Sequence, residues 1–68
     1  MQFQIELERE DVGRWIAEVP DLPGVMTCGR GRSDAVAKVQ ALALRVLADR
    51  LEHGETAAEP LQVSFKAA

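Results

Sequence analysis

Few residues in this 68-residue chain could do acid–base, nucleophilic or metal chemistry. His53 and Cys28 are the only soft metal ligands, and they lie too far apart in the sequence to predict a metal site. His53 follows a helix-forming stretch, where an imidazolium is favoured by the helix dipole rather than placed for catalysis. Cys28 is predicted at a strand end, as an apolar residue or as a thiol activated by Arg30 and Arg32. One histidine gives no Ser-His-Asp arrangement.

The carboxylates are the stronger enzyme candidates. Metal-dependent nucleases hold two ions with acidic clusters, and acidic residues lie on or beside the predicted strands at Glu6, Glu8, Asp11, Glu18 and Asp21. However, Glu6 and Glu8 also match the solvent face of a half-buried strand. We therefore expect no catalytic residue, metal or cofactor. A residual metal-dependent nuclease that uses Glu6 and Asp21 is the alternative.

Anion or nucleic-acid binding has weaker support. Gly29-Arg30-Gly31 precedes a helix and resembles an anion-binding loop, but it has no P-loop lysine pattern. Arg30 and Arg32 are the basic residues that could contact RNA or DNA. Eleven acidic residues against eight basic ones give a net charge of −3. This balance argues against binding to nucleic acid without sequence preference.

Length and composition predict one small domain over residues 1–68. A single cysteine gives no internal disulfide, and small domains without such links often gain stability by oligomerising. We therefore expect a homodimer or a larger homo-oligomer. The sequence has no export-signal pattern and no apolar run of about 20 residues, so a cytoplasmic protein without membrane contact is expected.

The hydrophobic pattern predicts three strands followed by a helix. Residues 2–8 alternate between apolar and polar, residues 15–19 and 25–28 favour strands, and polar residues 9–14 with Gly13 suit a hairpin. Residues 34–52 contain no glycine or proline and predict a helix. Either Ser33 or Gly31 could cap its start, and Gly54 would end it.

The predicted helix has an apolar face that is wider than one contact requires. Its inward stripe contains Val36, Val39, Ala43, Val46 and Leu47, with Leu42 and Leu51 beside it. Ala41, Leu44 and Ala48 lie outside this stripe. They indicate a second buried contact, such as another subunit; alternatively, Ala41 and Ala48 are simply exposed helix formers.

A fourth strand over residues 61–65, after a linker over 55–60, completes the order β-β-β-α-β. The predicted fold class is α+β, with an antiparallel sheet and one helix packed on one face. Pro60 favours an edge position for the last strand. The expected central core is Phe3, Ile5, Leu7, Val36, Val39, Val46, Leu47, Val63 and Phe65, with Trp15 or Ile16 from the second strand.

Two prolines make a stiff corner between the second and third strands. Pro20 and Pro23 fix their own φ angles, and Gly24 can adopt a positive φ. Such a rigid corner suits a contact surface, because little entropy is lost on binding. Glu18, Asp21 and Leu22 are the predicted partner-binding residues; alternatively, Leu22 fills the core.

Residues 13–29, Gly-Arg-Trp-Ile-Ala-Glu-Val-Pro-Asp-Leu-Pro-Gly-Val-Met-Thr-Cys-Gly, resemble the signature of HicB-like antitoxins. The resemblance covers residues 2–54 and centres on Pro-Asp-Leu-Pro-Gly. It implies a truncated RNase H-like fold. It also implies a non-enzymatic role: HicB proteins bind and neutralise HicA toxins, small basic ribonucleases that degrade messenger RNA.

The sequence departs from the family pattern in two places. Arg30-Gly31 stand where many members carry an acidic residue and threonine. Many members also continue into a C-terminal DNA-binding domain, whereas this sequence ends at Ala68, so we expect no direct DNA binding. The resemblance therefore implies a short antitoxin of a type II toxin–antitoxin pair, or an orphan homo-oligomeric relative without a toxin.

Overall fold

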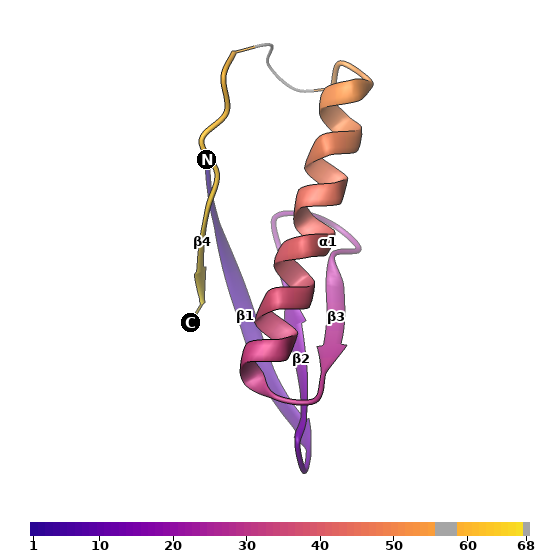
Figure 1. Cartoon of the computed structure of the whole chain (residues 1–68), viewed down its shortest axis with the longest axis vertical. Helices are drawn as coiled ribbons and strands as arrows, with labels where there is room; N and C mark the ends of the chain where they lie inside the picture. The colour runs from indigo at the N-terminus through magenta and orange to yellow at the C-terminus, as the bar shows by residue number, and fades with distance from the viewer. Residues whose placement is uncertain (56–58, 68) are drawn as a thin grey trace.

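The computed structural model describes residues 1–55 and 59–67 and contains a four-stranded sheet with one helix across one face (Figure 1). The elements follow the predicted order: β1 Gln2–Asp11, β2 Arg14–Glu18, β3 Met26–Gly29, α1 Arg32–Glu52 and β4 Ser64–Ala67. The α+β class is therefore confirmed. Part of the predicted linker, and Ala68, lie outside the described residues.

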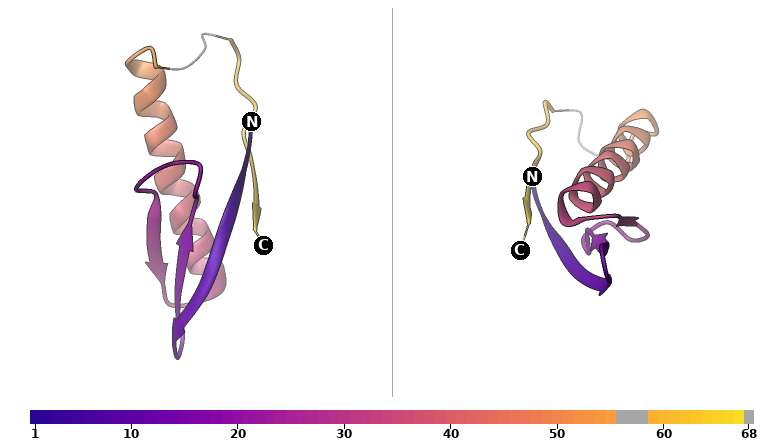
Figure 2. Two further views of the ribbon diagram at one scale, coloured as in Figure 1. Left: turned by 180° about the vertical axis from the view of Figure 1, so that it is seen from behind. Right: turned by 60° about the horizontal axis from the view of Figure 1, so that its bottom comes forward.

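The sheet is mixed, so the expected antiparallel sheet is wrong. Its strand order is β3-β2-β1-β4; β2 runs antiparallel to both β1 and β3, whereas β4 runs parallel to β1. The direction follows from the connections. Two hairpins give β3 the direction of β1, and α1 returns along the sheet, so the next strand must again run with β1. Figure 2 shows α1 on one side of the sheet and β4 beside β1.

The fourth strand begins three residues later than predicted. Ser64 is the first residue of β4 because it pairs with Gln2, the first residue of β1. Residues 61–63 extend beyond that end of β1 and have no strand to pair with; the amino group of Met1 donates to the Gln62 carbonyl there. The predicted edge position of β4 is confirmed.

The core is made of smaller side chains than expected. The helix buries one residue in every four, namely Ala35, Val39, Ala43 and Leu47. On the sheet and its loops, the buried residues are Phe3, Ile5, Ala17, Val19, Leu22 and Val25. Leu7, Val36, Val46, Val63 and Phe65, which we expected at the centre, are only partly buried at its margin. Alanines at the centre let the helix lie close to the sheet.

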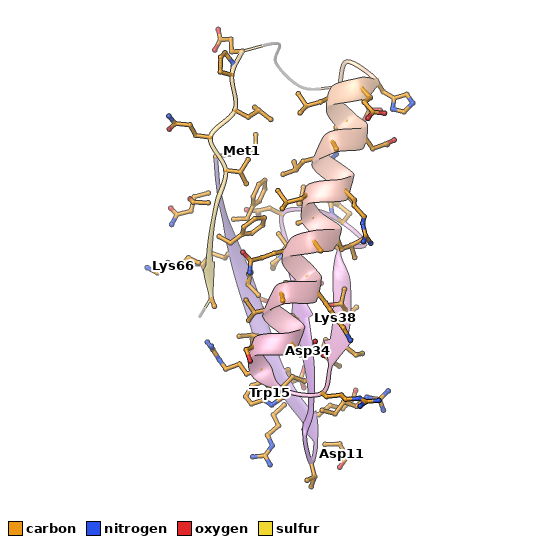
Figure 3. The ribbon with its side chains drawn as sticks, in the orientation of Figure 1. Met1, Asp11, Trp15, Asp34, Lys38 and Lys66 are labelled. Carbon is orange, nitrogen blue, oxygen red and sulfur yellow. The ribbon has the colours of Figure 1, made fainter. Side chains whose placement is uncertain are left out.

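The alternation of side chains along β2 decides whether Trp15 or Ile16 contributes to the core. Trp15 and Ala17 lie on the helix side of β2, and Trp15 packs against the core, so Ile16 must point to the opposite face. Figure 3 places Trp15 near the start of α1.

The helix begins where β3 comes closest to it. Gly31 is the N-cap residue and makes no side-chain cap, so Ser33 is not the cap. A Cβ atom on residue 29 would lie 2.4 Å from the Ala35 backbone nitrogen, which is a steric clash. Glycine has no Cβ atom, so Gly29 allows this close approach. At the other end, His53 is the C-cap and Gly54, with φ of 68°, ends the helix as predicted.

The proline corner consists of two consecutive β-turns. The Leu22 amide donates to the Val19 carbonyl, and the Val25 amide donates to the Leu22 carbonyl, each at 3.0 Å. The second turn has Pro23 at its second position and Gly24, with φ of 85°, at its third, which is the type II pattern. The Val19 amide then donates to Val25 at 3.0 Å and closes the loop. The stiff corner is confirmed.

Candidate protein-interaction face

The sheet has one face that α1 does not cover. Because side chains alternate along a strand, the residues between the buried ones point away from the helix. We call this surface the open face; its central residues are Glu6, Glu8, Ile16, Glu18, Met26 and Cys28.

The strand register arranges the open face in two rows. Glu6 lies opposite Glu18, which in turn lies opposite Met26. In the next row, Glu8 lies opposite Ile16, which lies opposite Cys28. Carboxylates therefore occupy the β1 side of the face, and apolar side chains occupy the β3 side. Met26 is 54% exposed, a large exposure for a side chain of this size.

The open face gathers three carboxylates, those of Glu6, Glu8 and Glu18. Within the described part of the chain, the ion pairs recorded do not involve Glu6, Glu8 or Glu18. Like charges directly opposite on neighbouring strands are destabilising, by up to about 1 kcal/mol. A hollow of about 310 Å³ is lined by Glu6, Leu7, Glu8, Ile16 and Glu18. The isolated chain therefore exposes negative charge beside apolar surface.

The three predicted contact residues occupy different environments. Glu18 is exposed on the open face and Asp21 is exposed on the proline corner. Leu22 is only 2% exposed, so the expectation that it lies at the surface is wrong. The corner turns its side chain inward, where it packs in the core with Val19 and Val25.

The structure does not bring the predicted nuclease carboxylates into a metal site. Glu6 lies in the middle of β1, whereas Asp21 lies on the corner beyond the end of β2. Among residues 1–55 and 59–67, no group of three or more potential metal ligands is found.

His53 interacts with the end of its own helix. Its Nδ1 lies 2.8 Å from the Asp49 carbonyl oxygen and 3.3 Å from the Asp49 carboxylate. This is the helix-end position predicted for it. Cys28 lies in β3 and is exposed on the open face.

The suggested anion-binding loop is used by the chain itself. The Arg30 amide donates to Asp34 Oδ2 at 3.0 Å, and Lys38 Nζ lies 3.1 Å from the same oxygen (Figure 3). These interactions, with the Arg30 amide first, lower the pKa of the Asp34 carboxyl below its usual value. The first turn of α1 thus already holds an acidic group.

Sequence reasoning did not identify Ile16 and Met26 as surface residues of one patch. The alternation of side chains along β2 and β3 could have identified them, because Ile16 and Met26 point to the face opposite to that of Ala17 and Thr27. The pairing of Glu6 with Glu18 depends on the hairpin register. Sequence alone did not determine that register, which includes an irregularity between Arg9 and Asp11.

Over residues 1–55 and 59–67, the structure contains no helix that combines the length and the hydrophobicity of a membrane span. Comparison of the chain with protein-family models, with curated proteins and with solved structures finds no match.

Proposed function

We propose that this chain is a non-enzymatic protein-interaction domain, specifically an antitoxin that binds a basic, HicA-type mRNA-degrading toxin in the cytoplasm. The observation that carries the proposal is the open face, where three carboxylates that form no ion pair recorded among residues 1–55 and 59–67 adjoin Ile16 and Met26. A partner's lysine or arginine placed between Glu6 and Glu18 would relieve their repulsion. Its apolar side chains would cover Met26.

The sequence motif and the fold support the same role. The resemblance to HicB-like antitoxins centres on residues 20–24, which form the two rigid turns next to β2 and β3. A truncated RNase H-like topology is part of this proposal, since a β-β-β-α-β order is what the resemblance implies. An acidic chain facing a basic toxin would also associate faster through electrostatic steering.

Calorimetry tests the proposal with a HicA-type toxin encoded beside this chain, in a catalytically inactive variant that can be purified. We expect tight one-to-one binding of the protomers. Absence of binding at micromolar concentrations would remove the antitoxin role.

A matched pair of double variants locates the contact. Glu6→Gln/Glu18→Gln and Glu55→Gln/Glu59→Gln remove the same charge from exposed sites. The first is expected to weaken binding about tenfold or more, yet to stabilise the free chain, because it removes a cross-strand repulsion. The second should change neither property appreciably. Equal losses from both variants would mean that net charge, rather than the open face, drives association.

A further inference from the structure

The outer surface of α1 carries an apolar stripe that is exposed in the described part of the chain. Ala41, Leu44, Ala48 and Leu51 follow one another at intervals of three, four and three residues, and all are exposed. Leu44 is 50% exposed and Leu51 is 43% exposed. We call these four residues the helix stripe. Intervals of three and four keep them on one side of a helix, as in the seam between two packed helices.

We propose that the helix stripe binds a second copy of this chain, with the two α1 helices antiparallel about a twofold axis near residues 45 and 46. In this register, Leu44 of one copy faces Ala48 of the other, and Ala41 faces Leu51. Each layer thus opposes a small side chain to a large one. This alternation fills the space between closely packed helices without voids.

The charges beside the stripe are complementary under the same symmetry. Lys38 and Glu52 are both exposed, and they lie at equal distances in sequence from residue 45. An antiparallel pair therefore brings Lys38 of each copy next to Glu52 of the other, twice per dimer. In the single chain Lys38 pairs with Asp34 at 3.1 Å, which leaves other ammonium protons for a second acceptor.

One contact opposes this arrangement. Arg45 of each copy approaches the same residue of the other at the axis, and this repulsion is reduced because Arg45 is exposed to solvent and salt.

The helix stripe lies on α1, and α1 covers the side of the sheet opposite to the open face. Self-association would therefore leave the open face free, and it does not depend on the antitoxin proposal.

Sedimentation equilibrium of the full chain over a range of concentrations tests this dimer. The wild type is expected to be dimeric at high micromolar concentration. Leu44→Glu is expected to weaken association at least about tenfold, because it places a charge in the seam. The control Val12→Glu changes a residue that is 89% exposed at the hairpin tip, and it should leave association unchanged.

A charge exchange tests the predicted register. Lys38→Glu and Glu52→Lys are each expected to weaken the dimer several-fold, and the double variant should restore wild-type association. Glu52→Lys places a cation in the last turn of α1, where the helix dipole favours it. Weaker association of this variant would therefore not be explained by poorer folding of the helix. A monomer at millimolar concentration, equal effects of Leu44→Glu and Val12→Glu, or no restoration in the double variant would overturn the proposal.

Discussion

Replacement of Leu22 by alanine separates the two roles that the proline corner could have. If Leu22 were a contact residue, Leu22→Ala would weaken partner binding and leave the free chain equally stable. Leu22 is 2% exposed and packs in the core, so we expect a loss of stability instead. Its backbone bonds to Val19 and Val25 do not require the leucine side chain, and the turns themselves should persist.

The expected loss is large for a chain of this size. Buried leucine-to-alanine changes cost about 3–5 kcal/mol, from lost transfer free energy and the cavity left behind. A domain of 68 residues is expected to have a free energy of unfolding of about 3–10 kcal/mol. A loss of 3 kcal/mol would lower Tm by about 12–24 °C.

Urea unfolding followed by fluorescence of Trp15, the single tryptophan, measures this loss directly. Trp15 packs at the margin of the core and should report its opening. Asp21→Ala, at the neighbouring position, is the control: the Asp21 side chain is exposed, so this substitution should cost less than about 0.5 kcal/mol. A Leu22→Ala variant as stable as Asp21→Ala would refute the buried position of Leu22.

Three further changes test the packing and the helix start. Gly29→Ala should cost at least about 2 kcal/mol in urea unfolding, because its Cβ would lie 2.4 Å from the Ala35 nitrogen; a neutral result would mean that β3 and α1 are farther apart. Thr27→Val should raise the free energy of unfolding by about 1 kcal/mol, since the buried Thr27 hydroxyl has no hydrogen-bond partner among the described residues, and a loss of stability would imply an unrecognised partner. Asp34→Asn should lower Tm at pH 7. Because the pKa of Asp34 is lowered on folding, its contribution is present above its ordinary pKa of about 3.9 and is lost as pH falls through the lower folded pKa. The Tm difference between wild type and Asp34→Asn should therefore vanish in strong acid, and a difference that persists there would exclude this electrostatic origin.

Local patterns predicted most of the elements. Alternation in residues 2–8 and the absence of glycine and proline from 34–52 identified β1 and α1, and the actual elements are only slightly longer. The paired prolines with Gly24 identified the corner. These features depend on backbone preferences within a few residues, which a single sequence contains.

Long-range features were harder to predict. The direction of β4 depends on counting chain reversals across the whole fold, and its start depends on where β1 begins. Leu22 was ambiguous because an apolar residue between two prolines suits a surface corner as well as a core plug. The open face needed the hairpin register, which pairs Glu6 with Glu18 and places Met26 beside them.

We propose that the partner binds the open face, and the single cysteine allows a direct test. Cys28 is exposed on this face, so a bulky maleimide attached to it should block the approach of a partner without altering the core. The control carries the same label on Cys28→Ser/Ser33→Cys, at the exposed start of α1 on the other side of the sheet. Titration with the inactivated HicA-type toxin is expected to give no binding for the Cys28 conjugate and wild-type affinity for the control conjugate. Undiminished binding to the Cys28 conjugate would mean that the partner binds elsewhere on the chain.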